Sequence, residues 1–355
     1  MEIKTVDIFC GIGGLTHGLV KAGLPVVAGV DVDGSCEYAY IINNNSQFIH
    51  KSIEDITGRE ICALLEGADY KILVGCAPCQ PFSTHSNKIK NIESSNKWNL
   101  LNEFLRIIRE VEPDIVSMEN VPNLANKEIF ALFVSELEAL GYVVKYQNVY
   151  CPDYGIPQKR RRLVLLASKH GEIPLVSKTH TKESYSTVRS AIGCLERLRN
   201  GQKSKTDRLH YTTRLSKKNL ARIKASKPNG TWQDWNESLK LDCQKKDTGS
   251  TYKSVYGRMS WEEPSPTITT QFFNYGTGRF GHPEQNRPLT IREAAILQTF
   301  PGNYIFAPED GAVSMNKLGI HIGNAVPPEL GEVIGKSIMA HIKKVECDKR
   351  VGHVQ

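Results

Sequence analysis

The chain reads Lys71-Ile72-Leu73-Val74-Gly75-Cys76-Ala77-Pro78-Cys79-Gln80 at the point that decides its architecture. The first four residues form an apolar run that predicts a buried strand, and the loop after it carries a cysteine between a proline and a glutamine. In α/β proteins the functional groups lie beyond the carboxyl ends of the strands. Thiol chemistry needs an exposed, partly deprotonated sulfur. The stretch therefore predicts a parallel sheet with Cys79 as a nucleophile at its edge.

Strand and helix signals alternate through the first half of the chain. Apolar runs predict strands, and apolar residues three or four positions apart predict the helices between them. The predicted strands cover residues 5–10, 25–30, 71–76, 113–117, 142–150 and 162–168. The clearest helix covers 127–140, and Gly23 and Gly141 are natural helix ends. This alternation predicts a Rossmann-like α/β fold, a mainly parallel sheet covered by helices on both faces.

Length and composition fit one large domain, or a large domain with a second, smaller one. The 355 residues are 40% hydrophobic and 23% charged. No apolar run approaches the ~20 residues that a membrane span needs. The first residues lead directly into a strand-like run, so we expect no signal peptide. Nine cysteines with one close pair indicate reduced thiols, and hence a cytoplasmic protein.

The positive charge of the chain is concentrated in one block. Residues 182–260 hold 18 Lys and Arg against 7 Asp and Glu, a balance of +11, although the whole chain carries +7. Such a block favours a polyanion as its partner, and the alternative is a solvated, loop-rich insertion. Helical periodicity also fades after about residue 174. We therefore predict a catalytic domain formed by 1–181 and 318–355, a small basic domain over 182–288, and a hinge and connecting segment over 289–317.

A glycine-rich turn, Phe9-Cys10-Gly11-Ile12-Gly13, joins the first strand to the first helix. Its glycines let a ligand approach the backbone closely, and Asp31, at the end of the second strand, can bind the hydroxyls of a ribose. The pattern fits a cofactor that contains adenosine, and the alternative is a tight turn without a ligand. Thr16 stands where a dinucleotide motif has its third small residue, which argues against NAD. Asp55 follows a third strand and could bind an adenine amino group or cap a helix.

The pair Cys76-x-x-Cys79 could be half a zinc site or a redox motif. No second pair of this kind occurs in the sequence, and the loop continues as Gln80-Pro81 instead of starting a helix. We therefore expect neither a metal nor a redox function.

Charged side chains follow two other predicted strands. Glu119 ends one of them, a place where a carboxylate is more often functional than structural. Gln158, Arg160 and Arg162 alternate, so they share one face of the backbone. The two arginines could clamp a phosphate, hold a carboxylate, or form a solvated basic edge.

Taken together, these motifs resemble those of the DNA (cytosine-5)-methyltransferases over nearly the whole chain except the basic block. The resemblance is carried, in chain order, by Phe9-x-Gly11-x-Gly13, Asp31, Asp55, Pro78-Cys79-Gln80, Glu119-Asn120-Val121, Gln158-x-Arg160-x-Arg162, Arg292-Glu293-x-Ala295, Leu297-Gln298-x-Phe300-Pro301 and Gly323-Asn324-x-Val326-Pro327. In that family the variable target-recognition domain occupies the position of the basic block.

The resemblance implies roles for individual residues. The S-adenosylmethionine site would be formed by residues from both ends of the chain, namely Phe9, Gly11, Gly13, Asp31, Asp55, Ile56, Asn324 and Val326. The family usually has Glu where Asp31 stands, so the ribose contact would be less direct. The flipped cytosine would meet Cys79, Glu119, Arg160 and Arg162, with Pro78, Gln80 and Ser83 as further substrate contacts.

The resemblance also implies a reaction. A thiolate that adds to C6 of cytosine turns C5 into a carbon able to attack the S-methyl group of the cofactor. The base must first leave the stack, and Glu119 would stabilise the charge that develops at N3 and the exocyclic amine. We therefore expect a monomeric prokaryotic enzyme that makes 5-methylcytosine in double-stranded DNA, with a cognate restriction endonuclease as a partner.

Three other functions stay open at this point. A tRNA cytosine-5 methyltransferase could use the same scaffold, and charge alone does not separate RNA from DNA. An inactive DNA-binding module is opposed by the intact motif around Cys79, and a nicotinamide-dependent oxidoreductase is opposed by Thr16. Within the basic block, the aromatics Phe272, Phe273 and Tyr275 predict either a base-reading loop or the core of the small domain.

Overall fold

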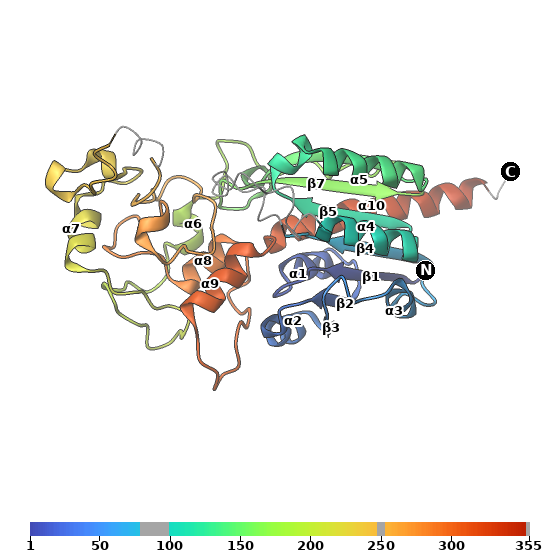
Figure 1. The fold of residues 1–355 in the computed structure, drawn as a ribbon, viewed down its shortest axis with the longest axis horizontal. Helices are drawn as coiled ribbons and strands as arrows, with labels where there is room; N and C mark the ends of the chain where they lie inside the picture. Colours follow the sequence, from blue (N-terminus) through green and yellow to red (C-terminus); the bar gives the residue numbers. More distant parts are fainter. Residues whose placement is uncertain (79–98, 247–252, 353–355) are drawn as a thin grey trace. The chain divides into compact units, whose positions relative to one another are not determined.

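The computed structural model describes residues 1–78, 99–246 and 253–352. The chain divides into two compact units (Figure 1). Unit 1 consists of Met1–Tyr150, Arg161–Thr179 and Val326–Gln355, and unit 2 consists of Cys151–Arg160 and His180–Ala325. Residues 289–317, expected to be a hinge, lie within unit 2.

The described part of unit 1 contains a seven-stranded sheet in the order β3-β2-β1-β4-β5-β7-β6. The strands are β1 (Ile3–Ile8), β2 (Val26–Asp31), β3 (Gln47–His50), β4 (Tyr70–Gly75), β5 (Ile115–Asn120), β6 (Val143–Tyr150) and β7 (Arg161–Ser168). Neighbours from β3 to β5 pair in parallel, whereas β7 runs antiparallel between β5 and β6. The predicted mainly parallel α/β sheet is confirmed.

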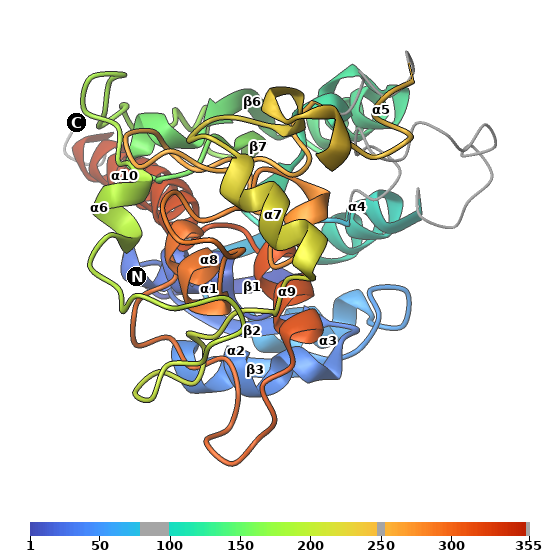
Figure 2. The ribbon, with the colours of Figure 1, turned by 90° about the vertical axis from the view of Figure 1, so that its left-hand side faces the viewer.

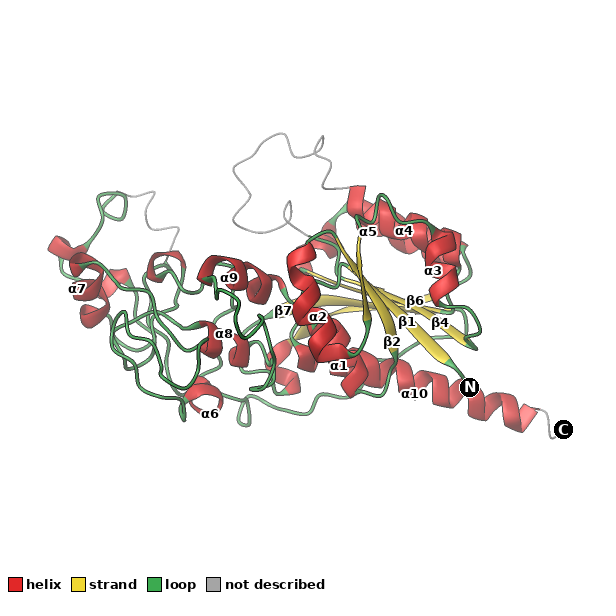
Figure 3. Ribbon diagram, turned by 90° about the horizontal axis from the view of Figure 1, so that it is seen from below, coloured by secondary structure: helices red, strands yellow, loops and turns green. Residues whose placement is uncertain are grey.

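Helices cover both faces of this sheet (Figure 3). They are α1 (Gly14–Lys21), α2 (Glu37–Asn44), α3 (Gly58–Leu64), α4 (Asn99–Val111), α5 (Glu128–Ala139) and α10 (Pro328–Gly352). On one face α1 packs closely against α10, since a Cβ added to Gly18 would lie 2.0 Å from the carbonyl oxygen of Pro328. Among the described residues, no helix combines the length and the apolar character that crossing a membrane would require.

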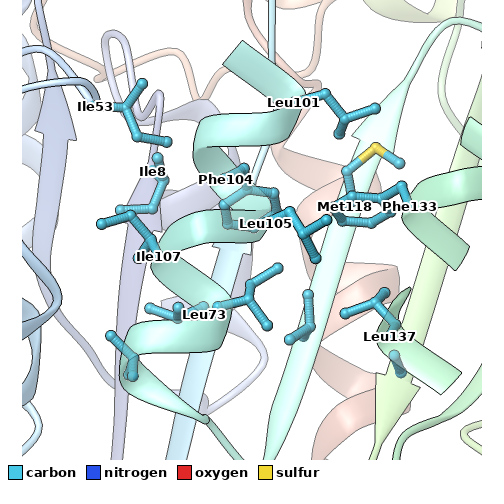
Figure 4. Close-up of a cluster of buried hydrophobic side chains, with 14 of the residues drawn as sticks. Ile8, Ile53, Leu73, Leu101, Phe104, Leu105, Ile107, Met118, Phe133 and Leu137 are labelled. Carbon is cyan, nitrogen blue, oxygen red and sulfur yellow. The ribbon is translucent and has the colours of Figure 1, made fainter. Parts of the chain in front are cut away.

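The other face of the sheet carries the main hydrophobic core (Figure 4). Apolar residues of α4 lie between the strands and α5, and Phe104 stacks on Phe133 with ring centroids 6.2 Å apart. Both rings are almost completely buried. Because this core holds the strands in place, it also fixes the loops that follow their carboxyl ends.

The described part of unit 2 contains four short α-helices, a few 3-10 turns and otherwise irregular segments (Figure 2). These are α6 (Val188–Ile192), α7 (Lys217–Ala225), α8 (Ile291–Leu297) and α9 (Met315–Asn324). Phe272, Phe273 and Tyr275 are 0%, 7% and 1% exposed. These aromatics are therefore core residues of unit 2, and the interpretation of them as a base-reading loop is wrong.

Buried arginines replace much of the missing regular hydrogen bonding in unit 2. Arg258 is 4% exposed and donates to the carbonyl oxygens of Ser226, Ile223 and His282. One side chain thus bonds three backbone segments of unit 2 to one another. Arg287 makes two bonds of 2.8 and 2.7 Å to the carboxylate of Glu293, and both side chains are almost completely buried.

Candidate active site

Three neighbouring strands end together at one edge of the unit 1 sheet. In the ladders, Ile8 of β1 lies opposite Gly75 of β4, and Gly75 lies opposite Met118 of β5. The loops that follow these strands therefore start side by side. This is the edge at which open α/β sheets bind ligands.

The loop that leads to Cys79 is anchored before it leaves the described residues. The backbone amide of Cys76 donates to the carbonyl of Ile8 over 3.3 Å, and the Asn120 side chain donates to the carbonyl of Ala77 over 3.1 Å. Pro78, the last described residue before the gap, is exposed. Cys79, Gln80 and Ser83 lie outside the described residues.

Glu119 is held between two side chains from the strands beside it. Its side chain is 3% exposed, and Arg162 from β7 brings Nε within 2.8 Å of Oε1. The Cys76 thiol donates to Oε2 over 2.9 Å. Oε1 accepts no hydrogen bond among the described residues, so this buried carboxylate at the strand edge keeps an acceptor available to a ligand.

Arg160 has other partners than Arg162. It belongs to unit 2, is 2% exposed, and donates to the carbonyl oxygens of Ile268 and Ala325 at 3.3 and 3.2 Å. Gln158 is also buried in unit 2, where it bonds to Gln298. These contacts hold segments of unit 2 together, so the described bonds of Arg160 lie in unit 2 and the ion pair of Arg162 lies in unit 1.

The glycine-rich turn adopts a backbone that glycine favours. Gly11 and Gly13 have φ values of +51° and +84°, and Phe9 has +65°. Asp31 accepts bonds from the amides of Gly11 and Asp33 at 2.8 and 2.9 Å. These two bonds hold its carboxylate at the end of β2, beside the glycine-rich turn.

The buried carboxyl group of Asp7 bonds to the helix that follows this turn. Asp7 is 1% exposed and accepts a 2.6 Å bond from the hydroxyl of Thr16 in α1. Burial raises the pKa of Asp7 to about 7, although the bond from Thr16 opposes the rise. This contact accounts for a threonine at position 16, where dinucleotide-binding motifs have a small residue, because the hydroxyl of Thr16 bonds to Asp7.

The remaining predicted cofactor residues have different environments. Asp55 is exposed beyond β3, whereas the side chain of Ile56 is 1% exposed and belongs to the core. Val326 is buried at the start of the last segment of unit 1, and Asn324 is exposed at the end of α9 in unit 2. Ile56 can therefore shape the loop that presents Asp55, but its side chain does not face solvent.

Two residues near the site were missed from the sequence. Val32 directly follows Asp31 and is 68% exposed, which is unusual for an apolar side chain beside a functional edge. In the sequence, the position of Val32 directly after Asp31, the acidic residue that ends β2, could have drawn attention to it. Cys76 entered the sequence analysis only as part of the pair with Cys79, and only the structure reveals its bond to Glu119.

Unit 2 has an open surface pocket of about 900 Å³ lined by three arginines, Arg197, Arg199 and Arg214. Arg197 pairs with Glu284 over 2.6 Å. Among the described residues, Arg199 and Arg214 have no carboxylate partner within ion-pair distance. The pocket is therefore a site of uncompensated positive charge within the basic block.

Comparison with known proteins identifies the class. Residues 3–340 match the family model of the C-5 cytosine-specific DNA methylases, and the chain belongs to this family. It is an enzyme that methylates cytosine at C5 in DNA, which decides against the RNA, oxidoreductase and inactive-module alternatives.

Individual relatives agree with this class. The chain is 52% identical to the Type II methylase M.HgiDII of Herpetosiphon aurantiacus, over 98% of each chain. Its fold is similar to that of a prophage-encoded DNA modification methyltransferase (E. coli), with a TM-score of 0.73, 20% identity, and coverage of 96% of this chain and 99% of the other. The Entamoeba histolytica methyltransferase EhMeth gives a TM-score of 0.67 at 15% identity, with coverage of 96% and 99%.

Proposed function

We propose that this methylase works through a covalent adduct between Cys79 and C6 of a flipped cytosine, with S-adenosylmethionine as the methyl donor. The observation that carries the proposal is the position of Glu119, buried and fixed by Arg162 at the sheet edge where β4 leads into the Cys79 loop. Incorporation of labelled methyl groups into DNA, followed by identification of the modified base, tests it.

Each residue has a separate task in this reaction. The Cys79 thiolate adds to C6, and Glu119 binds the N3 edge of the base, where charge develops as the sulfur adds. Arg162 keeps Glu119 in place through its ion pair. Loss of the C5 proton then allows the thiolate to leave. We assign Arg160 a supporting role in unit 2, in accord with its bonds to backbone carbonyls.

The residues of the glycine-rich turn fit an adenosine-containing cofactor. A Cβ built on Gly11 would have no other atom within 4 Å, so the turn leaves open space at this point. Asp31 would bind the ribose, exposed Val32 offers an apolar surface for the adenine, and Asp55 would bind its amino group. S-adenosylmethionine would supply an electrophilic methyl group on a sulfonium sulfur.

The first prediction concerns this cofactor site. Asp31→Ala and Asp55→Ala should each weaken the binding of S-adenosylmethionine and of its demethylated product. A lost hydrogen bond to a charged group typically costs ~1.5–3 kcal/mol, which corresponds to roughly tenfold to over a hundredfold in affinity. Isothermal titration calorimetry measures the dissociation constants directly. Glu54→Gln, next to Asp55 and also exposed, is the matched control and should bind like the unaltered protein. Unchanged affinity in both aspartate variants would remove them from the site.

We propose further that Arg199 and Arg214 contact phosphates of the DNA backbone. Arg214 packs closely against Gly201, because a Cβ built on this glycine would lie only 3.0 Å from the Cβ of Arg214. The adjacent Asn200 accepts a 2.8 Å bond from the amide of Leu215. A guanidinium on a fixed backbone and without an acidic partner is suited to a phosphate.

The second prediction follows from counterion release. Each phosphate contact contributes about −0.9 to the slope of log affinity against log salt. Arg214→Gln should therefore flatten this slope by roughly one unit while the methylated sequence stays the same. Fluorescence anisotropy of labelled duplex DNA at several salt concentrations gives the slope. Arg189→Gln is the control, because Arg189 already pairs with Glu262 in the same unit. An Arg214 variant with the original slope would exclude the contact.

We propose a setting in DNA restriction and modification. The name of the Type II relative with 52% identity supports a restriction-modification system in which an endonuclease acts on the same DNA sequence. We propose that the enzyme acts as a monomer in the cytoplasm of a prokaryotic cell.

A further inference from the structure

The bond between Cys76 and Glu119 joins the ends of two neighbouring strands. Cys76 is the first residue after β4, and Glu119 is the penultimate residue of β5. The Sγ atom lies 2.9 Å from Oε2, and the ladder that pairs Gly75 with Met118 fixes both backbones beside it. The contact is therefore built into the sheet and does not depend on a loop conformation.

Arg162 holds the same carboxylate from the opposite neighbour strand. β7 pairs with β5, and Arg162 places Nε 2.8 Å from Oε1. Oε2 thus accepts a hydrogen bond, whereas Oε1 has a charged neighbour but no hydrogen-bond donor among the described residues. Because a carboxylate offers about four lone-pair sites, both oxygens keep acceptor capacity for a ligand.

Two partners restrict a rotation that is otherwise loose. The terminal torsion of a glutamate has broad, roughly two-fold minima, so a single ion pair leaves the carboxylate plane free to turn. With Cys76 on one oxygen and Arg162 on the other, the plane and the remaining lone pairs keep one direction. Glu119 is also buried, so water competes little for these bonds.

We infer that Cys76 is a positioning residue, whose neutral thiol orients Glu119 toward the target cytosine. The inference rests on the proposed role of Glu119. It gives the first cysteine of Cys76-x-x-Cys79 a function as a hydrogen-bond donor, without a metal and without a disulfide. A hydroxyl at this position could serve the same purpose, whereas a methyl group could not.

Steady-state kinetics of three variants test the inference. Cys76→Ala should lower kcat about threefold to tenfold, because a thiol is a weak donor and its bond to a carboxylate is worth less than that of a stronger donor. KM for DNA should stay within about twofold. Cys76→Ser should restore kcat to within about twofold of the unaltered enzyme. Cys62→Ala, a half-buried cysteine of α3 in the same unit, is the control and should leave both constants unchanged.

The outcomes separate this inference from the proposed function. Equal kcat in Cys76→Ala and the unaltered enzyme overturns it, and so does an equal loss in the Ala and Ser variants. An unaltered enzyme that transfers no methyl group would instead refute the proposed function.

A second measurement needs no change at Cys76: the infrared S–H stretching band of one thiol should move to higher frequency in Glu119→Ala. Absence of any shifted band contradicts the bond.

Discussion

Cys79→Ser should lose methyl transfer to DNA by at least about four orders of magnitude in kcat, because removal of a covalent nucleophile eliminates the main reaction path. A thiol is partly ionised near neutral pH, whereas a serine hydroxyl is not, so the shape of the site is retained while the attacking group is lost. DNA affinity should change little. Transfer of labelled methyl groups gives the rate, and fluorescence anisotropy gives the affinity.

The covalent step can also be observed directly. DNA that carries 5-fluorocytosine at the target position should form an adduct with the unaltered enzyme that survives denaturation, because fluorine blocks the final elimination. Cys79→Ser should form none. Cys347→Ser is the control, since Cys347 is an exposed cysteine of α10, and it should form as much adduct as the unaltered enzyme. An adduct that persists in the Cys79 variant would assign the nucleophile to another residue.

Arg287→Met should destabilise unit 2 by about 3–5 kcal/mol, because it leaves the buried Glu293 carboxylate without its partner. Burial alone would raise the pKa of Glu293, but the charge and hydrogen bonds of Arg287, with smaller contributions from His282 and Thr290, together lower this pKa to about 2. The stability that this pair contributes is thus present above the ordinary glutamate pKa of 4.5 and is lost as pH falls toward 2. Urea unfolding followed by tryptophan fluorescence at neutral pH measures the loss, since three of the four tryptophans lie in unit 2.

A surface pair provides the comparison for this prediction. Arg197 and Glu284 form an ion pair of 2.6 Å, but their side chains are 69% and 50% exposed. Arg197→Met should therefore change the free energy of unfolding by less than about 1 kcal/mol. The double variant Arg287→Met with Glu293→Leu should recover much of the stability that the single variant loses. Equal effects at Arg287 and Arg197 would contradict the importance assigned to the buried pair.

The sheet was predictable because its strands are short apolar runs bounded by polar loops. The strand predicted over 162–168 is observed as Arg161–Ser168, and Gly23 and Gly141 follow helices α1 and α5 with φ of +83° and +86°. Local composition sufficed for central strands such as β5, which buries all its side chains, whereas β6 at the edge of the sheet is mostly exposed.

Tertiary contacts decided the features that the sequence did not predict. Arg160 and Arg162 alternate along the chain, yet the passage between the two units falls between them. The aromatics Phe272 and Tyr275 lie among glycines and polar residues, but they form the core of a unit with few regular elements. The bond from Cys76 to Glu119 depends on the order of strands in the sheet, which neighbouring residues do not encode.

Base-resolution methylation sequencing of DNA from cells that express the chain tests the central claim most directly. Cells with the unaltered protein should contain 5-methylcytosine at one position of one short, recurring DNA sequence, and cells with Cys79→Ser should contain none there. The proposed mechanism would be contradicted if no 5-methylcytosine appeared with the unaltered protein, or if the same pattern persisted with Cys79→Ser.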